Sequence, residues 1–153
     1  MAKRSAGMLL YRRRNEILEV FLVHPGGPLW AKKDFGAWSI PKGEYSDEED
    51  PLAAARREFE EETGMAIDGD FMDLGTIRQA GGKLVSAWAH QGDFDPARLT
   101  SNSVEMQWPP RSGRIVKFPE VDRGAWFTMG EAHERILAGQ RPILERLEEK
   151  LRA

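Results

Sequence analysis

One segment of the chain carries helix signals at both ends and constrains the fold most. Asp50 is a residue type that accepts hydrogen bonds from the first turn of a helix, and Pro51 suits the first helical position. Gly64 stands where a left-handed residue commonly ends a helix. The pattern therefore predicts a helix over 51–63. Its apolar positions recur at steps of three and four and can bury one face against a sheet: Leu52, Ala55 and Phe59.

β-prone runs precede and follow this helix. They are bounded by turn-forming residues, as strands usually are. The runs cover 6–11, 17–24, 37–40, 71–79, 83–90, 113–118 and 125–128. From Gly130 onward the apolar spacing becomes helical. Strands that flank one early helix and precede later ones predict an α/β fold in which a mixed β-sheet lies between helices.

Length and composition limit the class of protein. The 153 residues carry no linker, repeat or low-complexity tract, so we expect a single domain over 1–153. The absence of cysteine excludes disulfides, thiolate metal sites and a cysteine nucleophile. No apolar run approaches the roughly 18 residues that span a bilayer. Residues 1–15 also lack the apolar core of a secretory signal, so we expect a cytoplasmic protein.

Negative charge is concentrated around the predicted helix. Nine acidic and two basic residues lie between Glu44 and Glu62. Glu58, Glu61 and Glu62 are spaced i, i+3 and i+4, so their carboxylates emerge from one helical face. Such close like charges repel, and Arg57 offsets only part of them. The spacing alone leaves two interpretations open: a solvated acidic surface, or ligands for a hard divalent cation such as Mg²⁺ or Mn²⁺.

A longer pattern includes these glutamates. It reads Gly43-x5-Glu49-x7-Arg57-Glu58-Phe59-x-Glu61-Glu62-x-Gly64-Met65. This pattern resembles the signature of the Nudix hydrolases at every fixed position. The resemblance favours the metal-site interpretation and implies that family's α/β/α sandwich.

The resemblance also implies roles for the charged residues of the pattern. Glu58, Glu61 and Glu62 would be catalytic residues that bind Mg²⁺ or Mn²⁺, with the Gly43 carbonyl as a further ligand. Glu58 would in addition orient or deprotonate the attacking water. Arg57, the fourth catalytic residue, would hold the acidic cluster in place by charge-assisted hydrogen bonds.

Three positions are expected to shape the backbone around the helix. Glu49 would brace the loop that enters it. Gly43 and Gly64 are both interpreted as residues with positive φ angles, which glycine adopts without steric cost.

The residues just before the pattern bear on the substrate. Lys42 stands in Pro41-Lys42-Gly43, where members that cleave nucleoside triphosphates commonly have Pro-Gly-Gly. The sequence looks like the branch that hydrolyses dinucleoside polyphosphates such as diadenosine tetraphosphate, and Lys42 would bind a phosphate there. A solvated lysine is the alternative. Ala80-Gly81-Gly82 fills the region where that branch has a tyrosine and ADP-ribose-cleaving members have a proline, so neither marker is present.

Residues outside the pattern are candidates to complete the site. Trp108 and Arg111 lie in a turn-rich segment and could stack a base and hold phosphate, with ordinary packing as the alternative for Trp108. Glu120 and Glu105 compete for the position of an outer acidic metal ligand. The histidines are scattered along the chain and are expected to be structural or exposed: His24, His90 and His133.

The function implied is metal-dependent attack of water on phosphorus in a nucleoside diphosphate linked to a further group. The substrate that the resemblance favours most is diadenosine tetraphosphate, split to ATP and AMP. Two alternatives stay open: cleavage of a nucleoside triphosphate or nucleoside diphosphate sugar, and a non-catalytic nucleotide sensor. The partner is a small-molecule nucleotide. The net charge of −3 gives no reason to expect DNA or a membrane, and the basic run 12–14 is interpreted as a solvated turn, not as an RNA site.

Overall fold

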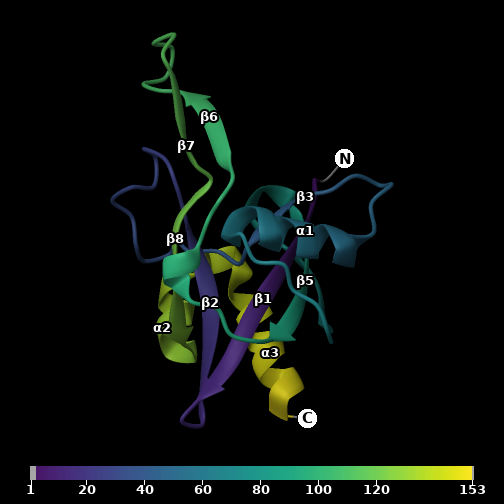
Figure 1. Ribbon diagram of the computed structural model, residues 1–153. Coiled ribbons are helices and arrows are strands. Elements are labelled where there is room, and N and C mark those ends of the chain that lie inside the picture. Colours follow the sequence, from purple (N-terminus) through teal and green to yellow (C-terminus); the bar gives the residue numbers. More distant parts are fainter. Residues whose placement is uncertain (1–2, 153) are drawn as a thin grey trace.

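A computed structural model describes residues 3–152 and contains a large sheet, a small sheet and helices on both faces of the large one (Figure 1). The strands of the large sheet are β1 (Arg4–Arg14), β2 (Ile17–Pro25), β3 (Lys42–Glu44), β4 (Met72–Arg78), β5 (Leu84–Gln91) and β8 (Val121–Thr128). The small sheet consists of β6 (Ser103–Gln107) and β7 (Ile115–Pro119). The α-helices are α1 (Pro51–Thr63), α2 (Met129–Arg135) and α3 (Arg141–Arg152). Short 3-10 turns are η1 (Ala80–Gly82), η2 (Pro96–Arg98) and η3 (Ala138–Gln140).

The large sheet is mixed. Its strand order is β4-β5-β1-β2-β8, and β3 pairs with β1 off this path. β1 runs parallel to β5 and antiparallel to β2 and β3. Residues 5–11 of β1 are all buried, so both faces of this strand are covered. The predicted α/β sandwich with a mixed sheet between helices is confirmed.

Alternating side chains of β1 supply the two halves of the core. Met8 and Leu10 pack in the cluster that contains Phe59 of α1, whereas Leu9 packs in the cluster that contains Leu144 and Leu147 of α3. This alternation follows from the two-residue period of a strand. All six side chains are fully buried, and each such burial contributes about 1.5–3 kcal/mol to folding.

The helix predicted over 51–63 is confirmed at both ends. The carboxylate of Asp50 accepts a hydrogen bond from the Ala53 amide at 3.0 Å. Gly64 adopts a φ of 85° and donates its amide to the Glu60 carbonyl. The two ends of α1 are thus set by Asp50 and Gly64, the residues from which the sequence predicts them.

Elsewhere the elements differ in part from the sequence prediction. The run 37–40 does not form a strand. Its residues pair with two different segments in isolated bridges, Ser39 with Val23 and Trp38 with Ile136. β6 escapes prediction since its five residues include three polar ones. By contrast, the expectation of late helices from Gly130 onward is confirmed by α2 and α3. Within residues 3–152, no helix is long and apolar enough to cross a membrane.

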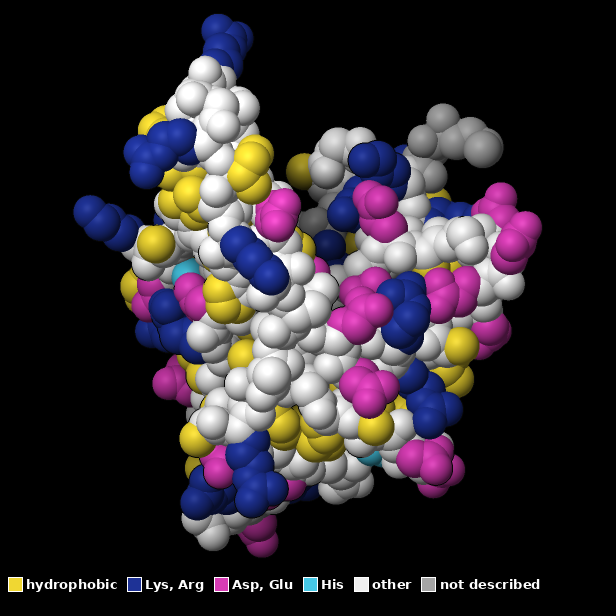
Figure 2. Space-filling model, turned by 45° about the horizontal axis from the view of Figure 1, so that its top comes forward, with side chains coloured by type: hydrophobic (Ala, Val, Ile, Leu, Met, Phe, Trp, Pro, Cys, Tyr) yellow, Lys and Arg dark blue, Asp and Glu magenta, His cyan; other side chains and the backbone are white. Residues whose placement is uncertain are grey.

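The β6–β7 hairpin projects from one end of the molecule (Figure 1). Its base lies near the β7–β8 junction, where Pro119, Glu120 and Val121 lead into the large sheet. Figure 2 shows acidic side chains gathered on the face beside this hairpin, with the surface hollowed between them and the hairpin.

The role of Asp50 in capping the start of α1 can be tested directly. Replacing Asp50 with Ala removes the acceptor for the Ala53 amide, so we expect a loss of about 1 kcal/mol in the free energy of unfolding. Urea denaturation followed by circular dichroism measures it. Glu48→Ala removes an exposed acid from the same loop and serves as the control. Equal stability of the two variants would contradict the cap.

Candidate active site

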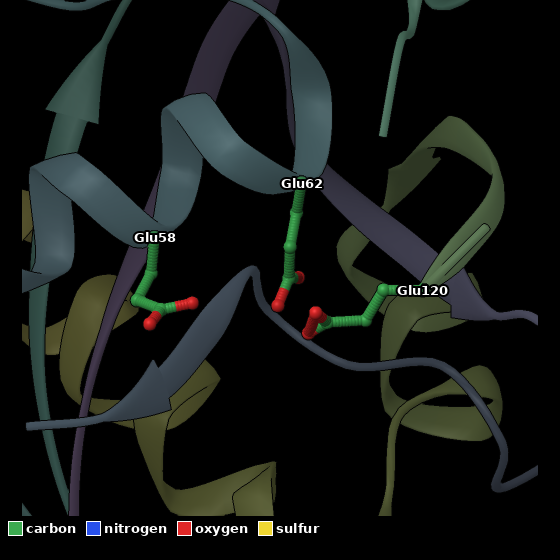
Figure 3. A group of neighbouring side chains, drawn as sticks. All are labelled: Glu58, Glu62 and Glu120. Atoms are coloured by element: carbon green, nitrogen blue, oxygen red, sulfur yellow. The ribbon is translucent and has the colours of Figure 1, made fainter. Parts of the chain in front are cut away.

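The site is built on the pairing of β3 with β1 beside α1. Gly43 lies opposite Ala6 in the β1–β3 register, and Lys42 lies opposite Gly7. α1 presents Glu58 and Glu62 toward this strand (Figure 3). Both residues are buried, with 7% and 5% of their surface exposed. Two acidic residues one helical turn apart are therefore withdrawn from water together.

A third carboxylate comes from a distant part of the chain. Glu120 lies at the β7–β8 junction and points toward Glu62 (Figure 3). One oxygen from each of Glu58, Glu62 and Glu120 lies within 4.8 Å of the others. The Glu120 side chain accepts a hydrogen bond from Asn102 at 3.1 Å, and its carbonyl accepts one from the Gly26 amide at 2.8 Å. Neighbouring segments thus fix both the backbone and the side chain of Glu120.

Arg57 connects the acids on the outer side of α1. Its guanidinium donates two hydrogen bonds to Glu49, at 2.8 and 3.0 Å, and one to Glu58 at 2.9 Å. It also donates to Glu61 at 3.1 Å. The hydrogen bonds to Glu49 raise the pKa of Arg57, and the same bonds lower the pKa of Glu49. Arg57 therefore stays charged and ties the loop before α1 to the acidic face.

Glu61 differs from its two neighbours. Its side chain is 41% exposed and rests on Arg57, and it does not belong to the group of three carboxylates described above. The structure brings Glu58 and Glu62 together with Glu120, while the expected metal-binding role of Glu61 stays a prediction.

Burial and mutual repulsion perturb the buried acids. Burial, together with the hydrogen bond and charge of Glu120, raises the pKa of Glu62 to about 10. Burial and the charge of Glu61 also raise the pKa of Glu58. Without a cation, the Glu62 carboxyl group therefore favours its protonated form. A divalent cation coordinated by these oxygens would replace that proton, and an all-carboxylate donor set suits Mg²⁺ or Mn²⁺.

Gly43 makes room for this arrangement. A Cβ at this position would overlap the carboxyl group of Glu58. The expectation of a positive φ at Gly43 is wrong, because the residue is paired in the extended strand β3 and is not among those with positive φ. Glycine is required by the close approach of a carboxylate to the backbone. The same expectation is confirmed for Gly64, whose φ is 85°.

A pocket of about 210 Å³ opens beside the carboxylates. Lys42, Glu62 and Glu120 line its polar end, and Val23 and Trp30 contribute to its apolar wall. Burial lowers the pKa of Lys42, and the nearby charge of Lys83 lowers it further. The volume is below the roughly 300–1,000 Å³ of a pocket for a whole drug-sized ligand, so it accommodates one part of a larger molecule.

The residues expected on the far side of the site are placed elsewhere. Trp108 and Arg111 lie at the tip of the β6–β7 hairpin, and Glu105 lies opposite Lys117 within it. Among residues 3–152, none of these three lines the pocket or joins the carboxylate group. Trp30, which lines the pocket, was not among the residues expected at the site. Its signal was weak: an aromatic residue just after the breaker cluster 25–28.

Comparison with known proteins agrees with this geometry. The model of the NUDIX domain family matches residues 1–147. This chain belongs to the NUDIX family. A curated relative is the rat bis(5'-nucleosyl)-tetraphosphatase [asymmetrical], which is 26% identical over 150 residues and covers 88% of this chain and 95% of its own. The expectation of a Nudix hydrolase is confirmed.

Solved structures share the Nudix fold. A C. elegans Ap4A hydrolase, in a binary complex, superposes with a TM-score of 0.65 at 21% identity, covering 99% of this chain and 98% of that one. The NUDIX domain of Shewanella oneidensis NrtR, complexed with ADP ribose, gives a TM-score of 0.66 at 17% identity, covering 99% and 89%. At these identities the likeness concerns the fold.

The choice between the two outer acids can be tested by metal binding. Glu120→Gln removes one of the three converging carboxylates, so we expect the affinity for Mn²⁺, measured by titration calorimetry, to fall at least about tenfold. Glu105→Gln alters a residue in the hairpin and should leave the affinity unchanged. The reverse order of effects would contradict the assignment.

The raised pKa of Glu62 predicts how stability depends on pH when metal is removed. The folded state holds its proton up to about pH 10, whereas the unfolded chain loses it near pH 4.3. Stability from this group is therefore lost as pH rises between those values. In EDTA, Glu62→Gln should stabilise the protein by at least about 1 kcal/mol at pH 9 and by much less at pH 5.

Thermal unfolding across this pH range measures the effect. Glu60→Gln, an exposed position on the same helix, is the control and should show no such trend. A Glu62→Gln variant that is no more stable than the parent protein at pH 9 would show that the carboxyl group is not forced to hold a proton.

Proposed function

We propose that this Nudix protein is a metal-dependent pyrophosphohydrolase that cleaves a nucleoside diphosphate linked to a further group, with dinucleoside polyphosphates as the favoured substrates. One observation carries the proposal. The three carboxylates, a half-buried lysine and an apolar pocket meet at one place, so the requirements for metal, phosphate and base are satisfied side by side. The similarity to the rat bis(5'-nucleosyl)-tetraphosphatase supports the same substrate class.

The metal would be held by Glu58, Glu62 and Glu120. The fit rests on their oxygen donors, on the raised pKa of Glu62 and on the space that Gly43 leaves for the Glu58 carboxyl group. The Gly43 carbonyl and Glu61 are further candidate ligands. A divalent cation bound there supplies neutralisation of phosphate charge and activation of water near neutral pH.

Glu58 is the residue we assign to the attacking water. One of its oxygens accepts a hydrogen bond from Arg57, which fixes the orientation of the carboxyl group and leaves the second oxygen for another partner. The proton of the water passes to a carboxylate as the new oxygen–phosphorus bond forms. The bridging oxygen–phosphorus bond breaks at the same time, and the leaving phosphate carries the negative charge.

Lys42 is the phosphate-binding residue of the proposal. It lies in β3 at the edge of the pocket, with Glu62 and Glu120 beside it and Lys83 close by. Two lysines together favour an anion, and a chain of several phosphates brings more negative charge than a monophosphate does.

Trp30 is our candidate for contact with the base. It replaces Trp108 in this role because it lines the pocket next to the carboxylates, whereas Trp108 lies at the hairpin tip. The apolar wall and a planar indole suit a nucleobase. The pocket holds one base, so the second nucleoside of a dinucleoside substrate would lie outside it.

Product analysis tests the proposal. Purified protein, Mg²⁺ and diadenosine tetraphosphate should give ATP and AMP, resolved by chromatography. A nucleoside triphosphate or nucleoside diphosphate sugar turned over faster would favour the first alternative. Nucleotide binding without turnover of any of them would identify a sensor. Release of orthophosphate from a nucleoside monophosphate would contradict the reaction class.

Lys42→Met tests the phosphate contact. The loss of one charge-assisted hydrogen bond should lower kcat/KM for the dinucleoside tetraphosphate by about 10- to 100-fold. Lys150→Met, an exposed lysine of α3, removes the same charge far from β3 and should change it less than about twofold. Equal effects of the two substitutions would mean that only the overall charge matters.

A further inference from the structure

His24 is the most enclosed ionisable side chain that the proposed mechanism does not use. It lies near the end of β2, and its side chain is fully buried. Nδ1 lies 2.9 Å from a carboxylate oxygen of Asp122, and Nε2 lies 2.6 Å from the Lys33 carbonyl oxygen. The carboxylate and the carbonyl are both hydrogen-bond acceptors, and the ring reaches them in opposite directions from its two nitrogens. Its face is closed by Trp38, whose ring centre is 5.2 Å away at a steep angle.

The Asp122 contact depends on an irregularity in the sheet. The β2–β8 register shifts between His24 and Pro25, which pair with Arg123 and Val121, so Asp122 has no partner on β2. An extra residue of this kind turns its side chain out of the regular alternation. Here the carboxylate comes to rest on the imidazole, and its other close charge is Arg123 at 3.6 Å.

The second contact holds a loop. We call residues 26–37 the tryptophan loop, because it carries Trp30 into the wall of the pocket. Its start is fixed by the Gly26 amide on Glu120, and its end by the Gly36 amide on Glu134. Between these two ends, the amides of Trp30 and Lys33 donate hydrogen bonds to carbonyl groups of the loop itself. The Lys33 carbonyl accepts a hydrogen bond from outside the loop, from His24.

We propose that His24 is a positioning residue that holds the tryptophan loop as the wall of the base pocket. One buried ring ties the middle of this loop, three residues from Trp30, to the strand that follows Glu120. The wall therefore keeps a fixed place relative to the carboxylates. The inference rests on the proposed function for the identity of the ligand, a nucleotide base, but not for the contact itself.

Binding measurements can tell an effect on the wall of the base pocket from an effect on the end that binds metal and phosphate. The probes are ADP, which carries a base, and inorganic pyrophosphate, which does not, each titrated with Mg²⁺ present. His24→Gln lacks the ring that reaches Asp122 and Lys33 on opposite sides, so it should weaken ADP binding about tenfold and leave pyrophosphate binding within about twofold. His90→Gln is the control, since His90 lies on β5, hydrogen-bonds the Asp70 carbonyl and stacks on Phe71, and neither partner belongs to the tryptophan loop.

A double-mutant cycle tests the route of the effect. Trp30→Ala should weaken ADP binding to a similar extent, and His24→Gln should add little in the Trp30→Ala background, since both act on one wall. Additive losses would overturn the inference. An equal loss of affinity for ADP and for pyrophosphate would overturn it as well, because a general perturbation of the structure would have that effect.

Hydrogen exchange gives a readout that does not depend on turnover or ligand. The peptide covering the tryptophan loop should exchange at least about tenfold faster in His24→Gln and at the parent rate in His90→Gln. Unchanged exchange would contradict the positioning role. If His24→Gln lacks a cooperative thermal transition, His24→Phe, which keeps a ring against Trp38, takes its place.

The two proposals can fail separately. Suppose that the parent protein hydrolyses none of the nucleotides, and that His24→Gln and Trp30→Ala each lose the preference for ADP over pyrophosphate. This result would refute the proposed function and support the role of His24. If instead the parent and His24→Gln both cleave diadenosine tetraphosphate with the same KM, the proposed function is supported and the role of His24 is refuted.

Discussion

Burial of two like-charged glutamates beside a third is the constraint on which the rest of the structure depends. Glu58 and Glu62 are almost completely withdrawn from water, and a carboxylate in that position is costly unless a proton or cation compensates it. On one side, Arg57 donates a hydrogen bond to Glu58. On the other side, burial and the neighbouring Glu120 raise the pKa of Glu62 to about 10 although Lys42 lies nearby, so without a cation this carboxyl group favours its protonated form. A folded protein that keeps such a feature at the edge of a pocket has a candidate site for a positive ion there.

The fold assembles this site from parts that are distant in the sequence. β3, α1 and the β7–β8 junction each contribute one component, and the tryptophan loop covers one side. Central strands β1 and β2 hold these parts in register, because both of their faces are packed. The β6–β7 hairpin projects beyond this frame (Figure 1) and contributes its base, where Asn102 and Glu120 bond each other. Rigid strands therefore carry the carboxylates, while loops carry the recognition surface.

The sequence predicts those features that depend on local spacing. The limits of α1 follow from Asp50 and Gly64, and the paired projection of Glu58 and Glu62 follows from the helical period. What escapes prediction depends on contacts between segments. Glu120 and Glu105 cannot be told apart in sequence, because the choice is made by the turn from β7 to β8. Trp30 lines the pocket and Trp108 does not, a difference set by how the chain folds, and Gly43 is glycine because of a carboxylate fifteen residues away.

Anomalous diffraction from crystals soaked in Mn²⁺ tests the central claim most directly. The account predicts a peak among Glu58, Glu62 and Glu120, with carboxylate oxygens from at least two of them close to about 2.0–2.2 Å from the ion. A fully soaked crystal that shows no peak there, with the three side chains directed apart into solvent, would contradict it.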